Sequence, residues 1–420
     1  MTSLGLLALV AALLVARQSV ILILLSAAAY VHFFWGDGQI VYLIEDMWSA
    51  MDNEVLLSIP MFMLTGATMS TGSSAQRLIA VVRAFTEWLP GGLAIAAVLS
   101  CAIFASISGS SPVTMLAVGT VLYPALKEVG YPKEYSLGAL ASSGTLGIII
   151  PPSIPLIIYG IITETSIADL FLAGILPGLL LAGMLAFYGL WRNRHIRSVP
   201  FSWARAVEAL REGIWALMLP VILLGGIYSG YFAPTEAAAV ALGYAILVEL
   251  FIHRELGFLA FFGIFKYTAQ LLGSIFPILA VALSLKSLLA TQGVPQAFAA
   301  MLAETFTSQV SYLIAVNIAL LIVGCFVDAL PTILILGPLL FAGAAKYGID
   351  PVHFGIIMVV NLELGFLTPP IGLNLIVAMT AFKEKFSTVV RSVLPFLGIM
   401  LVFLGMVTFI PEISLALLSK

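Results

Sequence analysis

Long apolar segments separated by short polar ones make up most of this chain. A helix needs about 20 predominantly apolar residues to cross the hydrocarbon core of a bilayer. Suitable stretches lie near 4–34, 55–70, 167–191, 213–231, 235–252, 271–289 and 387–410. The pattern predicts an all-α polytopic membrane protein, and we expect residues 1–420 to form a single membrane domain.

Two further apolar segments contain residues that interrupt helices. Residues 146–152 read LGIIIPP, and residues 364–370 read LGFLTPP. Within a bilayer, Pro removes an amide donor, so the backbone groups that such a break frees must meet protein, water or a ligand. We therefore expect broken helices over 135–163 and 350–382, and secondary transporters build their midplane binding sites from such helices.

The two breaks belong to a longer internal correspondence. A shift of 218 residues takes Gly147 to Gly365 and Pro177 to Pro395, so Gly and Pro fall in register repeatedly. Short apolar helices at 92–107 and 112–126, and at 310–326 and 330–345, are typical of re-entrant hairpins. We therefore expect a first repeat over 55–191, which contains the hairpin 92–126. Connecting scaffold helices follow over 192–270. The second repeat covers 271–410 and contains the hairpin 310–345.

Charge placement predicts the orientation of the two repeats. Only 9% of the residues are charged, against roughly 25% in a soluble domain. Lys and Arg favour cytoplasmic loops, which puts the basic loop 192–211 inside. Counting spans from it puts the acidic stretch from Asp37 to Glu54 outside. The first hairpin then opens from the cytoplasm and the second from outside, so the repeats are inverted, as alternating access around a fixed site requires.

Oxygen donors at the hairpin tips and helix breaks predict cation binding. The tip 106–111 is rich in Ser, and carbonyls freed at the end of a half-helix carry partial negative charge. Hard oxygen ligands suit a small cation such as sodium. A turn with local hydroxyl-to-backbone bonds is the alternative for the Ser cluster. The candidate cation ligands are Ser106, Ser108, Gly147, Ile150 and Pro152 in the first half, and Gly324, Asp328, Gly365, Thr368 and Ile371 in the second.

Amides at the start of each second half-helix point at an anion and predict a substrate site near the same level. The candidate substrate residues are Ser110, Thr145, Ser153, Glu363 and Asn374. Thr145, Ser153 and Asn374 either meet substrate or only satisfy backbone groups. A membrane-embedded acid costs about 2.5–3.5 kcal/mol on insertion scales, which favours functional roles for Asp328 and Glu363. Acceptance of amides at a broken helix is the structural alternative for both acids.

Other polar residues do not indicate enzymatic chemistry. Glu236 follows Pro234 at a helix start, where a cap favoured by the helix dipole explains it. Cys101 and Cys325 provide no disulfide framework, and the four His residues are scattered singly, so we propose no metal site of the His or Cys type. No His pair, Ser-Lys pair or pair of acids has catalytic spacing. We expect neither an enzyme nor a nucleic-acid-binding protein.

Several of these motifs resemble one family. They are SGSS at 108–111, GTLGIIIPPS at 144–153, GIYSG at 226–230, PTEAAA at 234–239 and TPPIGLN at 368–374. From near residue 55 to its end, the chain resembles the large membrane subunit of TRAP transporters, the tripartite ATP-independent periplasmic transporters. Pro112 departs from the pattern, because a small residue is expected after the Ser cluster.

The resemblance implies an elevator-type carrier in the bacterial inner membrane that takes up organic acids with a sodium gradient. It implies two sodium sites at the cation ligands named above, a secreted substrate-binding protein and a small four-helix membrane subunit. No segment before residue 55 resembles that subunit, so an unfused form is expected. The amphipathic stretches 75–89 and 293–306 fit arm helices along the membrane interface, or ordinary connecting helices. A stand-alone sodium-coupled anion symporter of the same fold is the alternative function.

Overall fold

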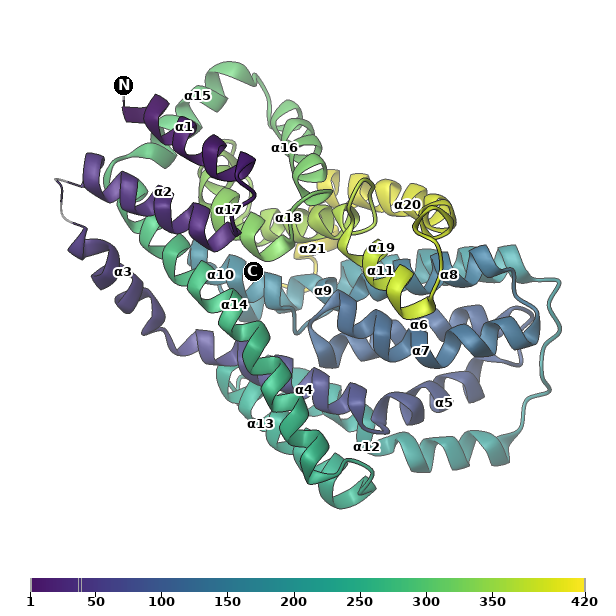
Figure 1. Ribbon diagram of the computed structural model, residues 1–420. Coiled ribbons are helices and arrows are strands. Elements are labelled where there is room, and N and C mark those ends of the chain that lie inside the picture. Colours follow the sequence, from purple (N-terminus) through teal and green to yellow (C-terminus); the bar gives the residue numbers. More distant parts are fainter. Residues whose placement is uncertain (1, 37, 39, 419–420) are drawn as a thin grey trace.

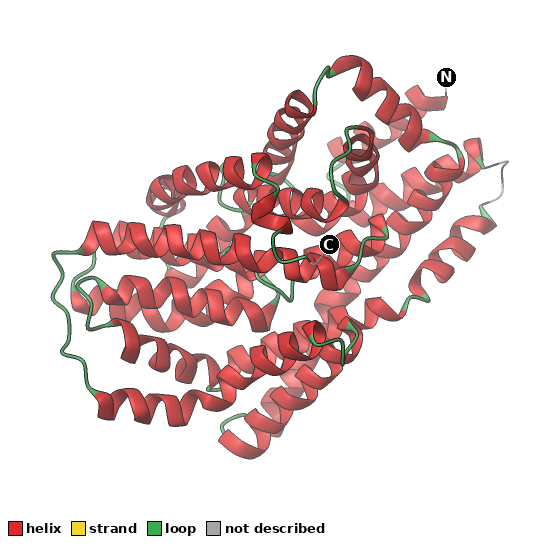
Figure 2. Cartoon of the chain, turned by 180° about the vertical axis from the view of Figure 1, so that it is seen from behind, coloured by secondary structure: helices red, strands yellow, loops and turns green. Residues whose placement is uncertain are grey.

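Helices form every regular element in the part of the chain that the computed structural model describes, residues 2–36, 38 and 40–418 (Figure 2). This confirms the all-α prediction. Seven of these helices are long and apolar enough to cross a membrane, and up to nine spans result if each of two bent helix pairs counts as one. Asp37, at one end of the expected outer acidic stretch, lies outside the described residues.

The N-terminal segment forms shorter helices than its hydropathy suggested. A turn at residues 16–19 divides the apolar stretch 4–34, and each resulting helix is shorter than the roughly 20 residues that a span needs. The next apolar helix bends by 69° into its successor. These elements are α1 (Thr2–Val15), α2 (Val20–Trp35), α3 (Val41–Met51), the 3-10 helix η1 (Glu54–Leu57), α4 (Ser58–Thr71) and α5 (Ser74–Thr86).

Each segment expected to form a hairpin or a broken helix is interrupted in the structure, and the first half has one additional short helix, α9. In the first half, the structure has α6 (Gly92–Ser108), α7 (Ser111–Val129), α8 (Lys133–Gly144), α9 (Leu146–Ile149) and α10 (Ile154–Thr163). In the second half, it has α16 (Gln309–Gly324), α17 (Ala329–Lys346), α18 (Pro351–Gly365) and α19 (Leu373–Phe382). The two helices of each expected hairpin pack against each other, and both Pro-Pro bonds at the breaks are cis.

Longer helices complete the chain. They are α11 (Ile167–Asn193), α12 (Trp203–Tyr228), α13 (Pro234–Leu247) with the π-helical turn η2 (Val248–His253), α14 (Phe258–Thr291), α15 (Val294–Thr305), α20 (Phe386–Phe409) and the short α21 (Glu412–Leu415). The α14 helix runs through residue 270, so the expected end of the connecting segment lies inside a helix. The amide of Ala233 donates to Glu236 Oε2 at 2.9 Å, which confirms the cap at the start of α13.

The helices form a peripheral layer and a central body. In the peripheral layer, α2, α3 and α4 pack against α14, and α13 and α12 continue the layer to α5 (Figure 1). The central body contains the helices α6 to α11 and α16 to α20, with α8 packed against α20 and α18 packed against α16. The two broken helices therefore lie in the body rather than in the layer.

The first broken helix and the first half of the second, α18, are strongly enclosed by protein. Every residue of α18 from Val352 to Gly365 is buried, and the apolar window of the segment 133–163 is 94% buried. The window of α12, which is also apolar enough to span, is only 28% buried. Close packing at the centre depends on small residues, because apolar burial does not drive helix association in lipid. A Cβ on Gly138, for example, would clash with the carbonyl oxygen of Ser392.

Candidate functional site

The tip of the first hairpin is a tight turn held by hydroxyl groups. The α6 helix ends at Gly109, which has a φ of +60°, a value that favours glycine. The hydroxyls of Ser108 and Thr114 share a hydrogen bond of 2.6 Å, and Ser108 is 1% exposed. Pro112 lies in the first turn of α7, where its missing amide donor is not needed. The departure from the family pattern thus fits a helix start.

This tip lies directly against the first helix break. A Cβ on Gly147 would lie 2.5 Å from the carbonyl oxygen of Ser110, so only glycine allows this approach. A Cβ on Gly109 would lie 2.9 Å from the Pro152 carbonyl oxygen. The amide of Ile154 also donates to the Gly109 carbonyl at 3.4 Å. The structure therefore brings carbonyl and hydroxyl oxygens from the tip and the break into one buried cluster.

The second tip and the second break make the corresponding contact. A Cβ on Gly365 would lie 2.6 Å from both the Cα and the carbonyl carbon of Gly324. The amide of Gly372 donates to the Cys325 carbonyl at 3.3 Å. Gly372 is the position to which a shift of 218 residues takes Ile154. In both halves an amide that follows the break thus donates to a carbonyl of the tip, although the acceptors Gly109 and Cys325 are not in register under this shift.

The second tip is more open than the first. A cavity of about 90 Å³ lies beside Gly324, Asp328 and Ile371, and the Ile371 side chain is 43% exposed. Asp328 is exposed, and its Oδ1 accepts the amide of Ala329 at 2.6 Å at the start of α17. Asp328 therefore accepts a backbone amide, as the structural alternative proposed for this acid requires. Its second carboxylate oxygen remains available for a ligand.

Several sequence-predicted residues bond within their own segment. Ser106 donates to the Ile103 carbonyl at 2.6 Å, and Thr368 donates to the Leu364 carbonyl at 2.7 Å. Ser153 donates to the Ile148 carbonyl at 2.6 Å and accepts the Leu156 amide at 3.3 Å. Thr145 donates to the Ser142 carbonyl. These hydroxyls form hydrogen bonds with backbone groups of the tips and breaks.

A buried polar chain connects the first tip with the second break. Ser111 donates to Glu363 Oε1 at 2.9 Å and accepts from Asn374 Nδ2 at 2.6 Å. All three residues are fully buried. Glu363 Oε2 and Asn374 Oδ1 have no hydrogen-bond partner within the described residues, so two acceptor atoms remain for a bound cation or donor. Ser111 was not among the sequence-predicted site residues, although its place in the Ser cluster was a usable signal.

A second polar cluster was also missed by the sequence analysis. The side-chain amide of Asn361 donates to the Asn317 carbonyl oxygen at 3.0 Å and to its Oδ1 at 2.7 Å, and Asn317 donates to the Thr408 hydroxyl at 3.2 Å. These residues join α16, α18 and α20. Isolated Asn residues in apolar helices were the only signal for this cluster.

Comparisons with known proteins agree with these features. The family model described as the DctM component of the tripartite ATP-independent periplasmic transporters matches residues 7–413. The C4-dicarboxylate TRAP transporter large permease protein DctM of Pseudomonas aeruginosa is 44% identical over 374 residues, which cover 88% of each chain. The ectoine TRAP transporter large permease protein TeaC of Halomonas elongata is 36% identical, covering 94% of this chain and 93% of that protein.

A solved structure shares the fold. The YdaH transporter of Alcanivorax borkumensis has a TM-score of 0.65 over 89% of this chain and 88% of its own, at 15% sequence identity. Fold and site together define a multi-pass membrane transport protein built around two broken helices. The chain belongs to the DctM family, the large permease component of TRAP transporters, as its motifs predicted.

Proposed function

We propose that this chain is the large transport subunit of a sodium-driven, binding-protein-dependent transporter that imports an organic acid anion across the bacterial inner membrane. The observation that carries the proposal is the pair of tip-to-break contacts. In each half, a hairpin tip approaches a glycine of a broken helix closely enough that no side chain fits between them. Such unwound backbone is the usual source of sodium ligands in secondary transporters.

We assign one sodium ion to each tip-to-break contact. In the first half, the hydroxyls of Ser106 and Ser108 with the backbone of 147–152 supply oxygen ligands. In the second half, the carbonyls around Gly324, Gly365 and Ile371 do so, with Thr368 and Asp328 beside them. The first cluster is buried and polar, and the second adjoins a cavity. Both donor sets consist of hard oxygen atoms, which fit sodium.

The substrate site lies between the two halves in this proposal. We place Ser110, Thr145 and Ser153 at this site from the first half and Glu363 and Asn374 from the second, with the hydroxyls of Thr145 and Ser153 bonded to carbonyls of their own segment. The hydrogen-bonded chain through Ser111 supports this arrangement, because it couples the first tip to the second break. Sodium binding at either contact would then position groups that belong to the opposite half.

Movement of the central body supplies alternating access. The inverted repeats make the central body of α6 to α11 and α16 to α20 the moving part and the peripheral layer its scaffold. Continuous packing through the buried α8 and α18 supports movement of the body as one unit, since packed cores are not continuously deformable. The arm helices of this proposal are α5 and α15. The chain bends by 69° between α4 and α5 and by 114° between α15 and α16, which suits helices that lie along the membrane interface.

The partners follow from the family. We infer a separate small four-helix membrane subunit and a periplasmic substrate-binding protein that delivers the anion. The isethionate TRAP transporter permease protein DctMQ of Oleidesulfovibrio alaskensis supports the inference of a small membrane subunit, because it extends beyond the part that matches this chain. It is 37% identical to this chain, and the match covers only 60% of that longer protein.

Uptake by proteoliposomes tests the proposal. The chain is reconstituted alone, with the small subunit, and with both the small subunit and a substrate-loaded binding protein. We expect uptake only with all three components and an inward sodium gradient. Uptake by the chain alone would instead support the stand-alone symporter, and undiminished uptake after replacement of sodium by potassium would refute sodium coupling.

A further inference from the structure

A second polar pocket lies between α5 and α12, and none of its lining residues belongs to the tips or breaks. It has a volume of about 280 Å³. Three alanines, Ala80, Ala84 and Ala209, and the segment 199–202 are among the residues that line it. The two helices pack closely beside it, because a Cβ on Gly213 would clash with a methyl group of Val81. The pocket is therefore part of a fixed helix pair.

The charges around this pocket are only partly paired with one another. Arg83 Nε donates to Glu87, which forms one internal pair, and Glu212 lies 4.0 Å from Arg77. Arg205 and Glu208 remain. They are three residues apart on α12, yet no ion pair joins them, because Arg205 Nη2 turns to the Pro200 carbonyl at 2.7 Å. Glu208 has no ion-pair partner within the described residues.

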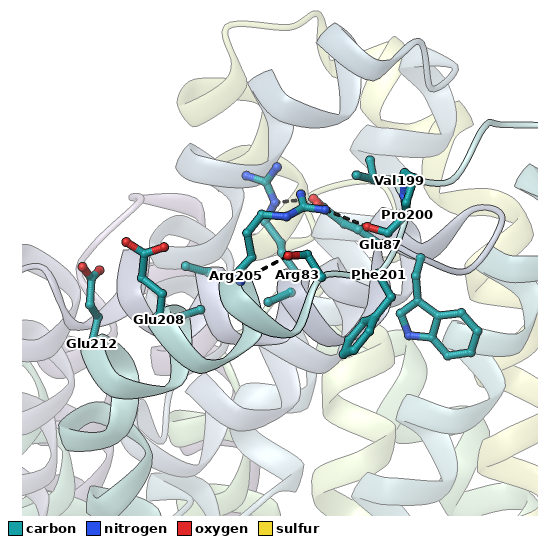
Figure 3. A pocket seen from close by; sticks show the side chains of 13 residues that line it. Arg83, Glu87, Val199, Pro200, Phe201, Arg205, Glu208 and Glu212 are labelled. Carbon is teal, nitrogen blue, oxygen red and sulfur yellow. Dashed lines mark hydrogen bonds and ion pairs between the residues drawn. The ribbon is translucent and has the colours of Figure 1, made fainter.

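The unpaired charges, Arg205 and Glu208, lie next to each other along α12. Figure 3 shows the Arg83 and Arg205 side chains next to each other, with Glu208 and Glu212 on one side and Phe201 on the other. One guanidinium keeps free donors, and one carboxylate keeps free acceptors. A ligand that carries both an anionic and a cationic group satisfies both, whereas a simple anion leaves Glu208 unpaired and adds repulsion.

The sequence around the pocket also has the pattern of a membrane–water interface. Charged residues on α12 end at Glu212, and the 16 residues from Gly213 to Tyr228 contain no charge. Exposed aromatic rings lie near the pocket edge: Trp88 is 48% exposed, and Phe201 and Trp203 meet edge to face with centroids 5.1 Å apart. Aromatic side chains of this kind mark the membrane–water interface.

We propose that this pocket binds the headgroup of phosphatidylethanolamine. The phosphate accepts hydrogen bonds from the free donors of Arg205 and Arg83, and the primary ammonium donates to Glu208. The acyl chains leave past Trp88 and Phe201 into the bilayer. Because the occupied pocket joins α5 to α12, the lipid would brace these two helices against each other.

Native mass spectrometry of the purified, delipidated full chain tests this assignment. The protein is titrated with phosphatidylethanolamine, phosphatidylglycerol and phosphatidylcholine of the same acyl chains. We expect about tenfold tighter binding of the first bound phosphatidylethanolamine than of the other two lipids, equivalent to 1.4 kcal/mol. Equal binding of the three lipids by the unmodified chain would overturn the proposal.

Two variants distinguish the headgroup contacts. Glu208→Gln should remove the preference for phosphatidylethanolamine over phosphatidylglycerol, and Arg205→Gln should weaken binding of both lipids. The matched control, Glu128→Gln, replaces an exposed acid on α7 and should leave the preference intact. If Glu208→Gln keeps the preference for phosphatidylethanolamine, the assignment is refuted, because the Glu208 carboxylate then does not contact the ammonium group of the lipid.

A soluble ligand of the same chemistry is the competing source. Phosphoethanolamine added in millimolar amounts should not displace the lipid, since it lacks the acyl chains that pass the aromatic edge. Displacement at equal molar ratio would overturn the lipid assignment in favour of a soluble ligand. Retained sodium-driven uptake in Glu208→Gln would separate this result from the proposed transport function, which does not involve this residue.

Discussion

Replacement of Gly365 by alanine is the most direct test of the second tip-to-break contact. The added Cβ would lie 2.6 Å from two backbone carbons of Gly324, whereas carbon atoms in contact are about 3.5–4.0 Å apart. The two segments must therefore separate by roughly 1 Å. Neither side can respond by a rotamer change, because both contacts are backbone, so we expect the upper part of the usual overpacking cost of about 1–3 kcal/mol.

Sodium-dependent uptake and thermal unfolding in detergent measure this effect. We expect the apparent melting temperature of Gly365→Ala to fall by a few degrees. We also expect the sodium concentration for half-maximal uptake to rise about tenfold, the equivalent of 1.4 kcal/mol. The control is Gly398→Ala on α20, where nothing lies within 4 Å of the added Cβ. This variant should behave like the unmodified chain.

Two outcomes would refute the reasoning about Gly365. A variant with unaltered melting temperature and uptake would show that the contact tolerates a side chain. A lowered melting temperature with unaltered sodium dependence would show that the contact is structural and that its carbonyls do not hold the ion. Gly147→Ala, whose Cβ would lie 2.5 Å from the Ser110 carbonyl oxygen, tests the first half in the same way.

Three further predictions concern topology, docking and pH. If the repeats are inverted, a cysteine at Thr165 should react with an impermeant reagent only from outside, and cysteines at Ser198 and Glu384 only from the cytoplasm; labelling of the Thr165 and Glu384 positions from one side would contradict the inversion. Charge reversal of Glu54 should weaken docking of the binding protein more in low salt than in high salt, because exposed charges are screened over about 8–10 Å, and a salt-independent effect would place docking elsewhere. Lys133 Nζ lies 2.6 Å from Glu384 and lowers the pKa of that carboxyl, so the pair stabilises the fold at neutral pH and loses its contribution as pH falls through the lowered pKa. Lys133→Met should therefore lower stability by about 1 kcal/mol or less at pH 7 and by less at pH 3, measured by thermal unfolding, and a larger loss at low pH would reverse the sign of this argument.

Local chemistry made several elements predictable from the sequence. The hairpin expected at 92–126 corresponds to α6 and α7 over 92–129, and the interruption after residue 149 follows from Pro151 and Pro152. The cap of Glu236 on the Ala233 amide was likewise predicted. Gly and Pro change which backbone angles and hydrogen bonds a segment can form, so their effect is present in a short stretch of sequence.

The contacts across the site were not predictable in the same way. Ser111 meets Glu363 and Asn374 across more than 250 residues, and the sequence indicates only that each is polar. Thr145 and Ser153, which were candidate substrate residues, bond mainly to their own broken helix. A hydroxyl has the same identity in either role, and only the packing of neighbouring segments decides which partner it meets.

By itself, the sequence determined the membrane class, the family, the breaks at the two Pro-Pro pairs and the glycines at the tips, because these depend on composition and local backbone geometry. Only the tertiary structure decided that α8 and α18 are enclosed by protein while α12 remains largely uncovered, and that the stretch 4–34 forms two short helices. Hydropathy cannot distinguish these cases, since the protein interior and the lipid tails are similarly apolar. Their difference lies in the close approach of small residues and in polar contacts between distant segments, which arise when the helices assemble.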